Sequence, residues 1–314
     1  MTNCDHEITI IGGGPAGSAA AMKLALLGFD VCIIEKKNFP RETLCGEFIS
    51  REVIENLRRL EIYDEFISLC PNPIKYFRLL NDDGKEISAS LNFPAFGLRR
   101  SVFDNYLLEN AKRKNIKVIQ PAEVKEIRRE GESFLLRLKN KNSEDFYIRS
   151  GHVIAAYGKQ NILDKSLERN FVNYRSNLNG VKIHLADTLL NKFDKEEIRI
   201  YLSDGFYCGI NAVDNNYITI CFLEKRKNNN SPPRESLLNH ISHSVKFKNL
   251  FKPGFEGYVK SEMIYGTGNI FFGKRSTNEN GIFMIGDAAG VIAPITGDGI
   301  GMAFQSAEII SQIL

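Results

Sequence analysis

The sequence predicts an α/β fold that carries an inserted antiparallel sheet, and three features support this prediction. A glycine-rich turn follows an apolar strand near the N-terminus, period-two strands fill the middle, and a second glycine cluster precedes the last helix. With 314 residues, the chain can form one large domain or two unequal ones. Its 43% hydrophobic and 25% charged residues are typical of a globular protein.

Composition excludes several classes of protein. A net charge of +3 is too small to favour a nucleic-acid partner. No apolar run reaches the length of about 18 residues that a membrane span needs, and the N-terminus lacks a signal-peptide pattern. The cysteines form no CxxC pair and no metal-ligand spacing, which predicts reduced thiols and no metal. We therefore expect a cytoplasmic protein; peripheral membrane contact and the oligomeric state stay open.

The first glycine turn lies between two strands and a helix. Residues 7–11 form a β-branched apolar run that leads directly into Gly12-Gly-Gly-Pro-Ala-Gly17. An alanine-rich helical stretch follows, and a second apolar run, 29–34, ends at Glu35. This strand–turn–helix–strand order is the one that a dinucleotide-binding fingerprint requires.

Each residue of the turn has a mechanical reason. Gly12 permits the tight turn, Gly14 lets the backbone approach a pyrophosphate, and Gly17 lets helix and strand pack closely. The helix N-terminus offers free amides and a positive dipole to phosphates. Glu35, 18 residues after Gly17, is placed to bind a ribose hydroxyl and disfavours a 2′-phosphate. The pattern favours an adenine dinucleotide over a purely structural turn.

The second glycine cluster lies close to the C-terminus. A strand at 282–285 is followed at once by Gly286-Asp287, and Pro294-Ile-Thr-Gly-Asp-Gly299 then turns into a helix that runs to the last residue. Asp287, at a strand end, can accept a hydrogen bond from a second hydroxyl group. An ordinary NAD-binding domain leaves this cluster unexplained.

With these two clusters, the sequence resembles the FAD-dependent group that includes p-hydroxybenzoate hydroxylase and the geranylgeranyl reductases. In that group, the first motif binds the ADP half of FAD, and the late GD motif with P-x-x-G-x-G binds the ribityl chain and flavin. The resemblance implies the same Rossmann-like FAD-binding domain here. The cofactor-binding residues that it implies are Gly12, Gly14, Pro15, Ala16, Gly17, Glu35, Lys36, Gly286, Asp287, Pro294, Gly297, Asp298, Gly299 and Ile300.

Two further segments carry the resemblance. Residues 39–47 look like the R-x-x-x-C-G segment of the reductase-like branch, in which Arg41 contacts the cofactor and Cys45-Gly46 lies beside the flavin. Residues 100–104 match R-x-x-F-D, in which Arg100 binds FAD. Cys45 is also the candidate catalytic residue. The alternatives are surface salt bridges for the two arginines and a small buried hydrophobe for Cys45.

One position departs from the group's pattern. Relatives carry A-D-G after a strand that here ends in Ala-Ala-Tyr-Gly158, so Tyr157 replaces an acid used near FAD and NAD(P)H. NADPH or NADH remains the expected electron donor, although this departure leaves the donor open.

The middle of the chain reads as strands. Residues 74–80 and 85–90 flank an Asp-Gly turn and predict a hairpin. Further strands are predicted at 180–186, 197–202, 205–213 and 217–223, and an exposed loop at 225–234. We expect a discontinuous FAD-binding domain at 1–73, 97–170 and 266–314, and an antiparallel substrate domain at 74–96 and 171–265.

Aromatic residues of these strands are the candidates for a substrate pocket. They are Tyr207, Phe206 and Phe222. Aromatic side chains in strands also pack in cores, so a core position is the alternative. Tyr207-Cys-Gly209 additionally resembles a tyrosine-containing strand motif of the reductase branch.

The resulting functional prediction is an FAD-dependent oxidoreductase that acts on an apolar or carrier-attached small molecule. The R-x-x-x-C-G segment favours a reductase that passes a hydride from FAD N5 to a C=C bond. The alternative is a flavin monooxygenase, which hydroxylates through a C4a-hydroperoxide. A non-catalytic flavoprotein and a flavin-free NAD-dependent dehydrogenase are further alternatives. The chain has no tryptophan, which excludes the W-x-W-x-I-P signature of flavin-dependent halogenases.

Overall fold

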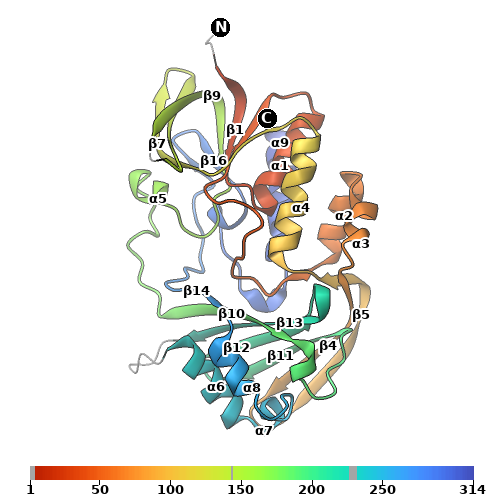
Figure 1. Ribbon diagram of the computed structural model, residues 1–314. Helices are drawn as coiled ribbons and strands as arrows, with labels where there is room; N and C mark the ends of the chain where they lie inside the picture. Colours follow the sequence, from red (N-terminus) through yellow and green to blue (C-terminus); the bar gives the residue numbers. More distant parts are fainter. Residues whose placement is uncertain (1–3, 143, 226–231) are drawn as a thin grey trace.

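Two eight-stranded sheets organise the computed structural model, which describes residues 4–142, 144–225 and 232–314 (Figure 1). Most of the predicted loop at 225–234 lies outside the described residues. Within the described part of the chain, no helix is both long enough and apolar enough to cross a membrane.

Sheet A has the strand order β15-β16-β9-β1-β2-β6, and β9 also pairs with the β7–β8 hairpin. The five strands from β16 to β6 run parallel, and they confirm the strands predicted near both ends of the chain. The strands of sheet A are β1 (His6–Ile11), β2 (Val31–Ile34), β6 (Lys117–Ile119), β7 (Ala122–Glu130), β8 (Ser133–Asn140), β9 (Asp145–Ala155), β15 (Asn278–Glu279) and β16 (Ile282–Met284).

Helices from both ends of the sequence pack together on sheet A (Figure 1). They are α1 (Pro15–Leu26), α4 (Arg100–Arg113) and α9 (Gly299–Ile313), with α2 (Arg51–Arg59) and α3 (Tyr63–Ser68) beside them. The alanines of α1 leave room for α9, so the first and last helices share one apolar core. A short helix, α5 (Leu163–Ser166), follows β9.

Sheet B has the order β14-β10-β13-β12-β11-β4-β5-β3. It confirms the predicted hairpin and the four predicted middle strands. Helices α6, α7 and α8 cover its face away from sheet A (Figure 1). The elements are β3 (Phe48–Ile49), β4 (Asn72–Asn81), β5 (Glu86–Gly97), β10 (Leu178–Ala186), β11 (Glu197–Ser203), β12 (Phe206–Ala212), β13 (Tyr217–Lys225), β14 (Ile264–Thr267), α6 (Pro233–His243), α7 (Val245–Lys248) and α8 (Phe255–Ser261).

Sheet B differs from the prediction in two details. Strands β4 and β11 pair in parallel, so the sheet is not wholly antiparallel. The chain between β4 and β11 includes strands β6 to β9 of sheet A. Parallel pairing of two strands needs a long connection of this kind. Strand β3 also joins this sheet, although Phe48–Ile49 lies outside the range predicted for the substrate domain.

The alternation of β12 and β13 corrects two of the predicted pocket residues. Phe206 and Phe222 are 5% and 1% exposed and belong to the core between sheet B and helices α6 to α8. Successive side chains of a strand point to opposite faces, so Tyr207 lies on the face turned away from these helices. We therefore do not retain Phe206 and Phe222 as pocket residues.

Candidate active site

The turn between β1 and α1 is crowded on its inner side and open on its outer side. Gly12 has φ 111°, and a Cβ there would lie 2.5 Å from the Ala156 carbonyl oxygen. A Cβ on Gly17 would overlap the Gly12 carbonyl oxygen. At Gly14, by contrast, the nearest atom is Arg41 Nη2 at 3.6 Å. The turn therefore exposes backbone at the helix N-terminus, where an anion is favoured.

Glu35 is held at the end of β2 beside this turn. Its side chain is buried, and its two oxygens accept hydrogen bonds from the Gly13 and Lys37 amides, both at 2.8 Å. Each carboxylate oxygen can accept more than one bond, so a ribose hydroxyl can still be bound. Lys36, in contrast, is exposed and lies beside Glu123 on the outer surface.

The two predicted cofactor arginines meet at one carboxylate. Arg100 Nε and Nη2 donate to Asp104, one turn further along α4, at 2.6 and 2.9 Å. Arg41 Nη1 lies 3.4 Å from Asp104 Oδ2 and reaches Gly14 from the other side. Asp104 is fully buried, so it fixes both guanidinium groups in place.

The late glycine cluster packs directly against the first one. Gly286 has φ 59°, and a Cβ there would lie 2.8 Å from the Ala16 Cβ. The Asp287 carboxylate is about one-third exposed, 3.8 Å from Lys159 Nζ. Its main-chain carbonyl accepts a hydrogen bond from Arg275 Nη1 at 3.0 Å. The backbone is thus fixed while the carboxylate is left available to a ligand hydroxyl.

The start of α9 forms the second open helix N-terminus. Asp298 is the N-cap residue and accepts a hydrogen bond from Ser50 Oγ at 3.4 Å. Burial, together with the nearby negative charge of Glu52, raises the pKa of Asp298. Gly299 has nothing within 4 Å of a Cβ position. The backbone at the N-termini of both α1 and α9 is therefore open to a ligand.

The segment before α9 brings further predicted residues together. Gly297 has φ 67°, and a Cβ there would lie 3.1 Å from the Phe48 ring. Pro294 is exposed, whereas Ile300 is buried in the α9 core. The Tyr207 hydroxyl of sheet B donates to the Pro294 carbonyl at 3.5 Å. Burial raises the pKa of Tyr207, with a smaller contribution from nearby Cys221, so the phenol stays protonated near neutral pH.

Cys45 and Gly46 form the edge of the loop that faces this region. Cys45 is partly buried, and its Sγ accepts a hydrogen bond from the Glu47 amide at 3.3 Å. A Cβ on Gly46 would have nothing within 4 Å, so its backbone also faces open space.

Tyr157, just after the end of strand β9, enters a buried polar cluster. Its hydroxyl donates to Asp164 Oδ1 at 2.7 Å, and Arg169 Nη1 lies 3.2 Å from the same oxygen. Arg169 Nη2 also donates to the carbonyls of Ser276 and Ala288 at 2.8 and 2.9 Å. The cluster therefore connects β9 to the segment that follows Asp287. Sequence reasoning missed it, because no local pattern marks the partners.

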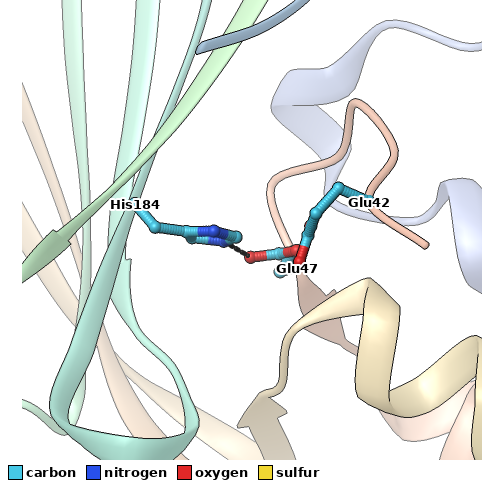
Figure 2. A group of neighbouring side chains, drawn as sticks. All are labelled: Glu42, Glu47 and His184. Carbon is cyan, nitrogen blue, oxygen red and sulfur yellow. Dashed lines mark hydrogen bonds and ion pairs between the residues drawn. The ribbon is translucent and has the colours of Figure 1, made fainter. Parts of the chain in front are cut away.

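A second buried cluster, also missed, connects the loop of Cys45 to sheet B (Figure 2). The Glu47 carboxylate accepts hydrogen bonds from Lys182 Nζ at 2.7 Å and from His184 Nε2 at 2.6 Å. The Glu42 carboxylate accepts a bond from the same Lys182 Nζ at 2.6 Å. Burial by itself raises the pKa of Glu47. The His184 hydrogen bond and the Lys182 charge lower it by more than burial raises it, so the pKa is about 2. Two polar side chains on one face of the apolar strand β10 were the available signal.

Because the pKa of Glu47 is low, we expect the free energy of unfolding to depend on pH. Its pKa falls from 4.5 to about 2 in the folded protein, so its contribution is full above pH 4.5 and is lost as the pH falls toward 2. A shift of this size corresponds to about 3 kcal/mol. Urea unfolding of the wild type and Glu47→Gln, from about pH 5 down to about pH 3, should show a difference that shrinks with acid. A pH-independent difference would contradict the assignment.

Comparison with known proteins also indicates an FAD-binding protein. The family model described as "FAD binding domain" matches residues 5–314. Digeranylgeranylglycerophospholipid reductase 3 of Methanosphaera stadtmanae is 27% identical over 98% of this chain and 76% of its own length. Digeranylgeranylglycerophospholipid reductase of Methanosarcina acetivorans is 25% identical over 98% and 74%.

Solved structures share the fold. A flavoprotein/dehydrogenase from Cytophaga hutchinsonii has a TM-score of 0.79 and 19% identity, covering 98% of this chain and 78% of that one. The myxobacterial chondrochloren halogenase has a TM-score of 0.83 and 19% identity, covering 97% and 73%. At this identity the likeness concerns the fold alone.

The residues described above fit FAD. Gly14 and Gly299 leave open backbone at two helix N-termini, and Glu35 and Asp287 offer carboxylates to hydroxyl groups. Direct packing of Gly286 on Ala16 places the two motifs side by side, as a dinucleotide that spans both requires. The chain therefore belongs to the FAD-binding-domain family, and it is an FAD-dependent oxidoreductase.

Proposed function

We propose that the protein is a reductase that saturates C=C bonds in the isoprenoid chains of a lipid. The observation that carries this proposal is the similarity, over 98% of the chain, to proteins named digeranylgeranylglycerophospholipid reductase. FAD, when bound and reduced, supplies the hydride. The protein must then bind an apolar chain, orient it and provide a proton.

The face of sheet B that carries Tyr207 supports an apolar substrate. Strand pairing places Leu202 and Leu223 directly beside Tyr207 on this face. The same face continues across β11, β4 and β5 through partly exposed or exposed apolar side chains, which are Ile198, Phe77, Leu79 and Ile87. An apolar chain lying here would end at the Tyr207 hydroxyl, a neutral proton donor beside Pro294.

We assign the cofactor contacts to the open glycines and the carboxylates around them. The first set, near α1, is Gly12, Gly14, Pro15, Ala16, Gly17, Glu35, Arg41 and Arg100, and the second, near α9, is Gly286, Asp287, Pro294, Gly297, Asp298, Gly299 and Ile300. Cys45 and Gly46 would lie between the two sets, with Cys45 as the candidate catalytic thiol. Lys36 is the weakest of the sequence-based assignments, because its side chain is exposed beside Glu123.

Product analysis tests the reaction. FAD-loaded protein, chemically reduced without oxygen, is mixed with a digeranylgeranylglycerol phospholipid, and the product is examined by mass spectrometry. A gain of two hydrogens per double bond is expected. Gain of one oxygen atom in aerobic reactions with NADPH, without saturation, would favour the monooxygenase instead. No change in any of several isoprenoid lipids would contradict the proposed substrate class.

We further propose NADPH or NADH as the electron donor. Tyr157 replaces the acid of the family, and its hydroxyl is engaged with Asp164 rather than exposed to a second nucleotide. Loss of the oxidised flavin absorption after either nucleotide is added, without oxygen, would support this donor. Reduction by dithionite but by neither nucleotide would contradict it and would indicate a different electron donor.

Replacing Asp287 by alanine should weaken FAD binding by about tenfold to a hundredfold. A buried hydroxyl group of the ligand would lose a charged acceptor, and such hydrogen bonds contribute about 1.5–3 kcal/mol. Quenching of FAD fluorescence on titration measures the change. Asp204→Ala, in the exposed turn between β11 and β12, is the control. Equal affinity of wild type and Asp287→Ala would remove Asp287 from the site.

A further inference from the structure

Glu47 adopts an unusual backbone conformation at the junction between the Cys45 loop and sheet B. Its φ is 61°, a left-handed value that residues other than glycine and asparagine seldom adopt, and its side chain is fully buried. The residues before it, Cys45 and Gly46, border open space. A strained residue therefore stands directly behind the exposed edge of the loop.

Three separate elements converge on the Glu47 carboxylate. Oε1 accepts bonds from Lys182 Nζ of β10 and from the Arg100 amide in the first turn of α4, at 2.7 and 2.9 Å. Oε2 accepts bonds from His184 Nε2 at 2.6 Å and from the Thr219 hydroxyl of β13. A carboxylate is favoured at a helix N-terminus, so α4 adds to its stabilisation.

The same residue also holds its neighbours through its main chain. Its amide donates to Cys45 Sγ at 3.3 Å, and its carbonyl accepts a bond from the Leu98 amide at 3.1 Å. Glu47 therefore holds the thiol through its amide and docks the loop through its carboxylate, while the thiol also interacts with the Arg100 side chain.

A metal ion is the other occupant that this cluster suggests. Glu42, Glu47 and His184 offer ligand atoms that lie within 4.8 Å of one another. However, the Lys182 ammonium contacts both carboxylates, at 2.6 and 2.7 Å, and is fully buried (Figure 2 shows the other three side chains). The chain therefore supplies the cation itself, which favours an internal ion pair over a metal.

Buried ion pairs rarely add stability relative to apolar side chains of the same size, so a different role is needed to explain this one. We propose that Glu47 is a positioning residue, which holds the Cys45–Gly46 edge against sheet B in the geometry that the flavin site requires. This inference rests on the proposed placement of Cys45 and Gly46 beside FAD. Its test is a property of the Cys45 thiol, so it can fail independently of the proposed reaction.

Alkylation of Cys45 by iodoacetamide measures the positioning in the FAD-loaded protein. Trypsin releases Glu42–Arg51, in which Cys45 is the single cysteine, and Leu60–Lys75, in which the exposed Cys70 serves as an internal reference. In Glu47→Gln we expect Cys45 to react about tenfold faster relative to Cys70, because a buried set of charged hydrogen bonds is broken. The same increase is expected without FAD.

Two further variants separate positioning from general stability. Glu42→Gln removes a charge from the same Lys182 but leaves the Glu47 contacts intact, and its Cys45 should react at close to the wild-type rate. Glu47→Gln/Lys182→Met removes both members of the buried pair, so its thermal stability should largely recover. Its Cys45 should nevertheless remain fast.

The combination of outcomes decides the proposal. If the double variant regains both its stability and the slow reaction of Cys45, Glu47 has a structural role and the proposal fails. An unchanged Cys45 rate in Glu47→Gln has the same meaning. If Glu47→Gln does not fold, the Cys45 rate is measured in the double variant and in Thr219→Val. The latter removes one hydroxyl donor from the same carboxylate.

Discussion

Gly14→Val should weaken FAD binding severely and leave the protein folded. A Cβ at Gly14 meets no atom closer than Arg41 Nη2 at 3.6 Å, and this is the end of a flexible side chain that can move aside. The valine methyl groups would instead fill the space that a pyrophosphate must enter to reach the α1 amides. We expect the dissociation constant of FAD to rise at least about a hundredfold, the loss of roughly 3 kcal/mol or more. Fluorescence titration measures it.

Gly17→Val is the matched control for this prediction. A Cβ at Gly17 would overlap the Gly12 carbonyl oxygen, so this variant should fail to fold rather than fold without cofactor. Circular dichroism separates the two outcomes. A yellow Gly14→Val protein with a full complement of FAD would contradict the fingerprint interpretation. An unfolded one would show that the outer side of the turn is packed, contrary to the structure.

Arg169→Met should reduce the free energy of unfolding by about 3–5 kcal/mol. The guanidinium is fully buried and is bound to Asp164 and to two carbonyls, so its removal leaves a buried carboxylate and two carbonyl acceptors without their partner. Urea unfolding, monitored by circular dichroism, measures the loss. We also expect weaker FAD binding, because the Ala288 carbonyl follows directly after Asp287.

The control for Arg169 is an exposed ion pair. Arg128 contacts Glu126 on the surface of β7, and Arg128→Met should leave the free energy of unfolding almost unchanged, because an exposed ion pair contributes little. Adding Asp164→Asn to Arg169→Met should restore part of the lost stability, because a neutral amide then replaces the buried carboxylate that has lost its cationic partner. A loss in Arg169→Met as small as that in Arg128→Met would show that the cluster is solvated.

The parts of this fold that could be predicted from sequence are those that local patterns determine. The first glycine cluster and Glu35 directly follow β1 and β2, and Gly286 and Asp287 lie just after β16, so local patterns locate all of them at strand ends. Those motifs also carry the family resemblance, so the cofactor followed from them.

Long-range partners could not be predicted in this way. Glu47 meets Lys182 and Thr219, and Arg169 meets the Ala288 carbonyl, across more than a hundred residues in each case. The error for Phe206 and Phe222 has another cause. Aromatic character indicated burial correctly, but the face on which each side chain lies depends on strand register, which aromatic character does not reveal.

The packing of Gly286 on Ala16 has a consequence for the order of events during protein synthesis. Helix α1 shares its core with α9, and β16 pairs with β9, so the N-terminal turn lacks these packing partners until residues 282–313 have left the ribosome. Contacts between such distant segments form slowly. We therefore expect FAD to bind only after α9 has been synthesised, and nascent chains that stop before α9 should not retain FAD.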